Sequence, residues 1–179
     1  MVEFGCALEQ KYARVVNLSF NGCQIGDLGF SKIYRYLSNP EFLCRLDLSG
    51  CDLSPVAMSM IIESLKTQFM RGQGQFWIEN LRKSDLEVDP SKALGIKVLR
   101  LNSNPRLSGA IVPLLTAVCY DDLKCLERIE LRKCEIESSN KFNATLEDML
   151  DKLPGTLSVL DLRENPILEN QTSRNGTIL

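Results

Sequence analysis

One spaced pattern recurs along the chain and constrains its fold more than any other feature. The pattern is L-x-x-L-x-L-x-x-C/N-x-L, in which the L positions are apolar and the ninth position is cysteine or asparagine. It is filled five times, over residues 15–25, 43–53, 96–107, 126–136 and 157–167. Only the third copy departs from it, because its last apolar residue comes one position late behind Pro105. Recurrence at fixed internal spacing indicates a stacked array of repeated units.

The pattern is typical of leucine-rich repeats, in which the L-x-L part is a short strand whose leucines point into the core. Equivalent positions lie 28 residues apart for Leu18 and Leu46, and 31 apart for Ile129 and Leu160. Units of this length leave room for a helix after each strand, as in the ribonuclease-inhibitor class of the repeat. Helices are wider than strands, so we expect an α/β solenoid curved into a horseshoe, with a parallel sheet on the concave face and helices on the convex face. The repeat domain should span residues 15–168, between a lead-in or cap at 1–14 and a polar tail at 169–179.

Helical patterns fill the intervals between the strands. Apolar residues there recur at i, i+3, i+4 and i+7, the spacing of an amphipathic helix. Ser54 and Pro55 make a good N-cap and first-turn pair, and Pro154 with Gly155 forms a stop signal. The expected helices are 27–37, 55–69, 108–119 and 139–153.

The ninth position of the pattern marks a sharp corner where the chain leaves the strand. Buried backbone N–H and C=O groups lose their strand partners there and need others. An asparagine side chain donates and accepts together, whereas cysteine offers a weak S–H donor and small apolar bulk. A metal site is the alternative, but the chain has no C-x-x-C pair and no histidine. We expect no metal or cofactor and interpret the corner residues as structural: Cys23, Cys51, Asn104, Cys134 and Asn165.

The composition of the chain argues against several classes of function. The formal net charge of −2 provides no basic field to gather nucleic acid or an anionic membrane. Seven cysteines without an export signal predict reduced thiols in a cytosolic or nuclear protein. With no histidine, acid–base chemistry at neutral pH would need other groups with shifted pKa values, and no nucleophile stands beside a base. We therefore expect a binding protein rather than an enzyme.

One interval is longer than the others, because 53 residues separate Leu46 from Leu99. The excess falls at residues 66–93, which hold the only tryptophan. In one interpretation the preceding helix extends to Arg71, breaks at Gly-Gln-Gly (72–74), and a second short helix at 76–82 packs on the convex side. In the other, the insertion is a partner-binding element anchored by Trp77 and flanked by Arg71 and Arg82. Long insertions are often functional, so both remain open.

Side chains that alternate with the buried leucines point to the concave face. Asp47, Arg100 and Glu130 should form a charge ladder there, since neighbouring strands lie about 4.8 Å apart. Mutually paired surface charges are the simpler interpretation. Five arginines and no lysine in these rows favour a protein interface, where arginine is enriched. The candidate binding residues on this face are Arg45, Asp47, Arg100, Arg128, Glu130, Arg132, Asp161 and Arg163.

The insertion also carries a family resemblance. Leu65-Lys66, Gln68, Met70-Arg71 and Trp77-x-Glu79-x-Leu81-Arg82 resemble the insertion in the leucine-rich repeats of the centrosomal protein of 78 kDa family. Flanking segments match as well, at residues 21–29, 101–104 and 160–166, so the resemblance covers roughly residues 14–168. Family members also have a coiled-coil carboxy-terminal part. This chain shows no heptad pattern and therefore resembles the repeat domain alone or a truncated copy.

The resemblance implies a non-catalytic interaction domain of a centrosomal or centriolar protein, located at the centrosome and the cilium base. It implies roles in cilium formation and in the regulation of a centrosomal ubiquitin ligase. The implied partners are centrosomal scaffold proteins and ubiquitin ligase subunits, with no nucleic acid and no membrane, and the domain is expected to be monomeric. The alternative is an unrelated cytosolic leucine-rich repeat module of sensor, effector or GTPase-regulator type.

Overall fold

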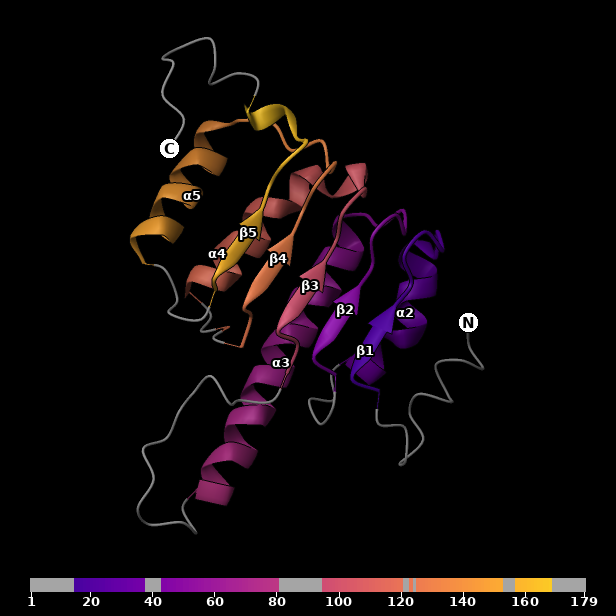
Figure 1. Ribbon diagram of the computed structural model, residues 1–179, viewed down its shortest axis with the longest axis vertical. Helices are drawn as coiled ribbons and strands as arrows, with labels where there is room; N and C mark the ends of the chain where they lie inside the picture. The colour runs from indigo at the N-terminus through magenta and orange to yellow at the C-terminus, as the bar shows by residue number, and fades with distance from the viewer. Residues whose placement is uncertain are drawn as a thin grey trace.

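A single parallel sheet runs through the part of the chain that the structure describes. The computed structural model describes residues 15–37, 43–80, 95–120, 123, 125–152 and 157–168, with the backbone alone for 72–80. The order of the strands in the sheet is their order in the chain (Figure 1). The strands are β1 (Asn17–Ser19), β2 (Arg45–Asp47), β3 (Val98–Arg100), β4 (Arg128–Glu130) and β5 (Val159–Asp161). The proposed lead-in at 1–14 and tail at 169–179 lie outside the described residues.

A helical segment follows each strand. The helices α2 to α5 pack against one another in sequence and line one side of the sheet (Figure 1). No helix among the described residues is both long and apolar enough to cross a bilayer. The result is an α/β fold, compatible with a solenoid-like arrangement. The helical elements are α2 (Gly26–Leu37), α3 (Pro55–Asn80), η2 (Pro105–Ala110), α4 (Ile111–Tyr120), α5 (Asn140–Asp151) and η3 (Pro166–Leu168).

The strand register confirms the repeat alignment read from the sequence. The middle residues of the strands pair in one row, with Leu18 opposite Leu46, Leu46 opposite Leu99 and so on to Leu160. The three inner members of this row are at most 1 % exposed, and Leu48, two residues after its strand centre, is fully buried. The core therefore lies between the sheet and the helices, where burial of apolar side chains drives the stacking.

The corner asparagines perform the backbone role expected of them. Asn104 Nδ2 donates to the carbonyl oxygens of Leu48 at 2.9 Å and Leu101 at 2.8 Å, while its Oδ1 accepts from the N–H groups of Cys51 at 3.1 Å and Leu53 at 3.2 Å. Asn165 repeats this pattern two corners further on, against the repeat of Cys134. Each asparagine thus satisfies buried backbone groups of two neighbouring repeats.

The two buried corner cysteines also contact the preceding repeat, each through one backbone carbonyl oxygen. Cys51 Sγ lies 3.1 Å from the carbonyl oxygen of Phe20, and Cys134 Sγ lies 3.2 Å from that of Leu101. Burial raises the pKa of the Cys51 thiol to about 11, so it remains protonated and able to donate. Cys23 occupies the first corner and is exposed. Within the described ranges, no group of histidine, cysteine or acidic side chains is arranged to hold a metal ion.

The expected helix break at Gly-Gln-Gly (72–74) was wrong. Helix α3 continues without interruption to Asn80, and residues 76–80 belong to it rather than to a second helix. A glycine inside a helix costs about 1 kcal/mol relative to alanine, which good helix formers on both sides offset. Figure 1 shows the second half of α3 extending beyond the ends at which the strands begin. Residues 81–94 lie outside the described part of the chain.

The start of the third expected helix, at residue 108, also differs from the expectation. In place of an α-helix from residue 108, the 3₁₀ helix η2 begins at Pro105 and leads into α4. The Leu107 N–H donates to the Asn104 carbonyl oxygen at 3.0 Å, the tighter spacing of a 3₁₀ turn. This turn absorbs the extra residue behind Pro105 and leaves Leu107 fully buried.

Gln68 holds together the segments on either side of the long interval between β2 and β3. Its side chain is fully buried, Nε2 donates to the Leu37 carbonyl oxygen at the end of α2, and Oε1 accepts from the Ile96 N–H at 3.2 Å. The amide of this α3 residue therefore connects α2, α3 and the chain that enters β3. Gln68, which contributes to the family resemblance, has a structural role.

Candidate functional site

The side of the sheet opposite the helices carries the candidate site. Because side chains alternate along a strand, the residues that flank each buried strand centre point away from the core. The register brings six of the eight candidate residues into the predicted rows. The other two, Arg132 and Arg163, follow β4 and β5 and contact Asp161 on the same surface. We call it the polar sheet face. Its members are Asn17, Ser19, Asn21, Arg45, Asp47, Ser49, Val98, Arg100, Asn102, Arg128, Glu130, Arg132, Val159, Asp161 and Arg163.

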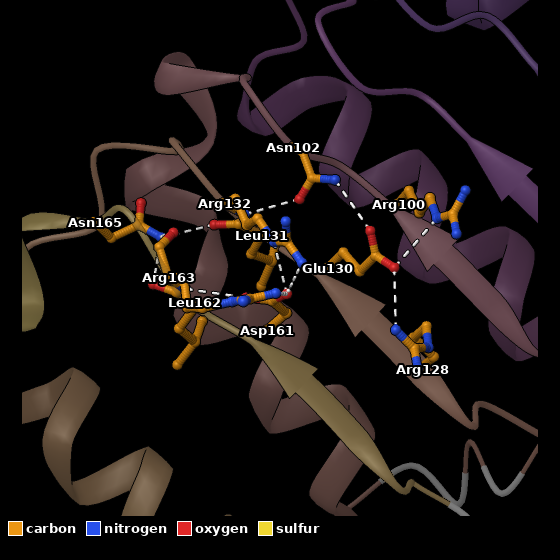
Figure 2. Close-up of polar contacts among 10 residues, drawn as sticks. All are labelled: Arg100, Asn102, Arg128, Glu130, Leu131, Arg132, Asp161, Leu162, Arg163 and Asn165. Carbon is orange, nitrogen blue, oxygen red and sulfur yellow. Dashed lines mark hydrogen bonds and ion pairs between the residues drawn. The ribbon is translucent and has the colours of Figure 1, made fainter. Parts of the chain in front are cut away.

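Glu130, at the end of β4, is the centre of one cluster on this face (Figure 2). Its Oε1 accepts from Arg100 Nε at 3.2 Å and from the Arg128 guanidinium at 3.4 Å, and its Oε2 accepts from Asn102 Nδ2 at 3.2 Å. Burial alone would raise the pKa of Glu130. The hydrogen bond from Asn102 and the nearby Arg100 charge outweigh that effect and hold the pKa below its ordinary value.

Asp161, at the end of β5, is the centre of a second cluster. Arg163 donates to both of its carboxylate oxygens, from Nε at 3.0 Å and from the terminal nitrogen at 2.8 Å, while Arg132 Nε donates to Oδ2 at 2.6 Å. The Arg163 hydrogen bonds are the main reason that the pKa of Asp161 lies well below its usual range. Two charged donors on one carboxylate make strong, directional hydrogen bonds.

The predicted charge ladder is confirmed. The Arg100 guanidinium lies 3.8 Å from Asp47 on β2 and 3.2 Å from Glu130 on β4, so it connects three neighbouring strands. Asn102 connects the two clusters, because its Oδ1 also accepts from the backbone N–H of Arg132 at 2.9 Å. Four arginines and three carboxylates therefore form one continuous polar network.

Arg45 lies apart from this network. It is exposed on β2, and no ion pair joins it to another residue within the described ranges. It lines a surface hollow of about 230 Å³ at the edge of the face, together with Val16, Asn17, Cys44, Lys97, Val98 and Glu127. The structure thus brings seven of the eight predicted residues together and leaves one beside them.

The three candidate residues of the insertion are only partly described. Arg71 lies on the surface of α3 and is exposed. Trp77 belongs to α3, but its side chain lies outside the described part of the structure, and so does Arg82 altogether. Their proposed role as a binding element therefore stays a prediction.

Sequence reasoning missed two polar features. Asn102 was not among the predicted binding residues, although it contacts both clusters; only its position two residues after Arg100 signalled that it shares the face. On the helical side, Tyr120, Asp148 and Lys152 form an exposed group in which Tyr120 donates to Asp148 and Lys152 Nζ lies 2.7 Å from the tyrosine oxygen. These residues come from α4 and the end of α5, and no sequence pattern connects them.

The network favours recognition over proton transfer. The pKa values of Glu130 and Asp161 both lie below their ordinary values, so both carboxylates are anions at neutral pH. Each already accepts hydrogen bonds from arginine. A general base needs an unpaired carboxylate whose pKa lies near the operating pH. A surface of oriented guanidinium groups instead suits the binding of anionic groups.

Comparison with known proteins adds a sequence relationship. No model of a known protein family matches the chain. The chain is 29 % identical over 160 residues to the centrosomal protein of 78 kDa of Mus musculus, and 28 % identical over 162 residues to that of Homo sapiens. Each alignment covers 89 % of the chain and only 20 % and 22 % of the mouse and human proteins. The chain thus spans about a fifth of the length of the curated relatives that it matches.

This similarity confirms the resemblance inferred from the insertion and the repeat corners. It extends over 89 % of the chain and therefore includes β2, β3 and β4, which carry most of the polar sheet face.

Proposed function

We propose that this chain, a relative of the centrosomal protein of 78 kDa, is a non-catalytic protein-interaction domain that acts at the centrosome. The observation that carries the proposal is the similarity to two centrosomal proteins along 89 % of the chain. The polar sheet face supplies the binding surface, because it presents four arginines held in place by hydrogen bonds.

The proposed architecture is a leucine-rich repeat horseshoe of the ribonuclease-inhibitor class. Five strands in chain order, the regular corner contacts of Asn104 and Asn165, and a helix after most strands support it. In such a solenoid the sheet forms the concave face, which is the usual binding surface of repeat proteins. The polar sheet face would then be the concave surface.

The finer roles follow from the family resemblance. We propose that the domain contributes to cilium formation and to the regulation of a centrosomal ubiquitin ligase, acting in the cytoplasm at the centriole and cilium base. Its partners would be centrosomal scaffold proteins or ligase subunits, bound by a monomeric domain. An effect on the ligase would come from binding, because the proposed surface holds paired rather than free carboxylates.

Proximity labelling in ciliated cells tests the proposal. A labelling enzyme fused to the chain should enrich centrosomal proteins, whereas the double variant Arg128→Glu/Arg163→Glu should lose most of that enrichment. Like charges introduced beside Glu130 and Asp161 would reverse the character of the face. An even cytosolic distribution of the labelled proteins for the unchanged chain would contradict the centrosomal role and favour the unrelated cytosolic repeat module.

A second pair of variants decides between the two candidate surfaces. Arg71→Glu/Arg82→Glu changes the charge of the insertion and leaves the polar sheet face unaltered. If the insertion is the interface, this variant should lose centrosomal enrichment and the face variant should keep it. Trp77→Ala completes the test: a buried tryptophan should lower stability by about 3–5 kcal/mol, whereas a partner anchor should cost about 2 kcal/mol or more in binding with little change in melting temperature.

A further inference from the structure

The charged groups of the polar sheet face are layered by depth. The carboxylate side chains lie at the bottom, with exposed fractions of 6 % for Asp161, 9 % for Glu130 and 17 % for Asp47. The arginine side chains lie above them, with exposed fractions from 36 % to 66 %. A molecule that approaches this face therefore meets guanidinium groups first, although acidic residues occupy neighbouring positions in the sequence.

From this layering we infer that the polar sheet face binds a carboxylate-rich segment of a partner protein. The inference rests on the proposed function and adds the chemistry of the partner. The outermost contacts would be Arg163, Arg100 and Arg128, in order of falling side-chain exposure. Aspartate and glutamate side chains match the planar donor geometry of guanidinium groups.

The buried carboxylates prepare the arginines for such a partner. Glu130 orients Arg100 and Arg128, and Asp161 holds Arg163 through two hydrogen bonds. Ordering a long, flexible side chain is one of the costs of association, and here the fold has already ordered these side chains. A guanidinium has five N–H donors, and Arg163 uses two of its nitrogens on Asp161. Donor capacity therefore remains on the solvent side of the network.

Charge balance also selects an acidic partner. The face carries five arginines against three carboxylates, a surplus of two positive charges on a chain whose formal net charge is −2. The charges that border it are paired with one another, as Lys97 with Glu127 at 2.9 Å and Lys133 with Glu164 at 3.1 Å. A basic partner would be repelled, and an apolar partner would bury guanidinium groups without compensation. A nucleic acid fits less well. A surplus of two positive charges, with carboxylates beneath the arginines, attracts a continuous phosphate backbone only weakly.

The spacing of the arginines suits an extended segment. Arg100 and Arg128 belong to β3 and β4, and Arg163 lies two residues after the end of β5. These three strands are adjacent, and strands in a sheet lie about 4.8 Å apart. Alternate residues of an extended peptide are about 6.6 Å apart, so two or three acidic side chains reach across these strands.

Fluorescence anisotropy with short labelled peptides tests the inference. The whole chain should bind an alternating glutamate–serine decapeptide, and the matching glutamine–serine peptide should bind at least about tenfold more weakly. Raised salt should weaken the glutamate interaction. Arg128→Gln/Arg163→Gln should reduce glutamate-peptide affinity by about tenfold or more.

The matched control is Arg106→Gln/Lys133→Gln. Both residues are exposed cations that pair with an acidic neighbour, Arg106 in η2 and Lys133 in the corner after β4, and neither is a member of the face. This control removes the same charge from the chain and should change the affinity by less than about twofold. Melting curves should show that both double variants are folded. If the face variant is not, Arg128→Gln alone replaces it, since Arg128 contributes a single hydrogen bond to Glu130.

Several outcomes would overturn the inference. Equal binding of the glutamate and glutamine peptides, or equal losses in the face and control variants, would show that the face does not select carboxylates. Tighter binding of a phosphoserine peptide or a single-stranded oligonucleotide would assign the face to another ligand class. If the glutamate peptide fails to bind while centrosomal enrichment persists, the inference fails and the proposed function stands. If the peptide binds at the face but enrichment is absent, the proposed function fails instead.

Discussion

Asn104 Nδ2 donates a hydrogen bond of 2.9 Å to the carbonyl oxygen of Leu48, which lies 56 residues earlier in the chain. The same side chain accepts from two N–H groups of that earlier repeat. One buried amide therefore closes the corner between two strands that an insertion separates in the sequence. The stacking of repeats depends on such contacts, because no single repeat can satisfy its own buried corner.

Asn104→Ala should lower the free energy of unfolding by about 3–5 kcal/mol, because it leaves several buried backbone groups without partners. Asn104→Cys should cost less, since the buried residues Cys51 and Cys134 occupy the equivalent corners of two other repeats. The control is Asn143→Ala, a half-buried residue whose side chain contacts Ser138, with an expected loss of about 1 kcal/mol or less. Urea denaturation of the three variants measures the differences. Equal losses for Asn104→Ala and Asn143→Ala would contradict the role given to the corner.

Leu48→Asp should unfold the protein. Leu48 is fully buried between stacked repeats, and an unpaired carboxylate there has no hydrogen-bond partner. Leu28→Asp is the control, because Leu28 is 75 % exposed in the first turn of α2, where a negative charge is tolerated. Circular dichroism during heating measures both variants. A cooperative melt of Leu48→Asp at the unchanged midpoint would show that Leu48 is not part of the core.

Asp161 should make stability depend on pH in the acid range. The pKa of its carboxyl is lowered in the folded protein, chiefly by the Arg163 hydrogen bonds. Its contribution is therefore fully present above the unfolded-state pKa of about 3.9, and it is lost as the pH falls toward the folded-state pKa. The stability difference between the unchanged protein and Asp161→Asn should be largest at neutral pH and shrink below about pH 4.

Denaturation of both proteins between pH 7 and pH 2 measures this difference. Asp52→Asn is the comparison, because Asp52 pairs with Arg106 at an exposed site and should contribute about 1 kcal/mol or less at neutral pH. A stability difference for Asp161→Asn that stays constant over the whole range would rule out the proposed linkage.

The buried thiols should resist alkylation in the folded protein. Burial raises the pKa values of Cys51 and Cys125 to about 11, so almost no reactive thiolate exists at pH 8. Cys23 is exposed and should react first with iodoacetamide, whereas Cys51 and Cys125 should react only after denaturation. Peptide mapping by mass spectrometry measures the order. Modification of Cys51 as fast as Cys23 without denaturant would contradict its burial.

The chain should also fold without metal. Mass spectrometry under native conditions should give the bare chain mass, and a chelator should leave the melting temperature unchanged. Stoichiometric zinc, or unfolding on addition of chelator, would show that cysteines serve as ligands, as they do in structural zinc sites.

The sequence by itself determined the strands, their register and the role of the corners. Short-range spacing carries this information, because side chains alternate along a strand and a one-residue slip would move Leu46 or Leu99 from the core to solvent. The same periodicity predicted which residues share the polar sheet face. It also predicted that Asn104 and Asn165 serve the backbone, since a buried corner needs a donor and an acceptor at one place.

The tertiary structure alone decided the features that depend on competing local preferences. Helix α3 continues through Gly72 and Gly74, and the turn behind Pro105 becomes 3₁₀, although the sequence pattern favoured a break and a later start. Intrinsic propensities differ by about 1 kcal/mol or less for most residues, so packing against neighbouring elements overrides them.

The sequence also did not predict how deeply each charged group of the polar sheet face is buried. The alternation of side chains predicts that Asp161 and Arg163 share a face. It does not predict that the carboxylate lies beneath the guanidinium. That order arises because a short aspartate side chain stays close to the sheet while a long arginine reaches over it and keeps its charged end in water. Only the folded structure, in which strands from distant repeats lie side by side, sets the arginines above the carboxylates.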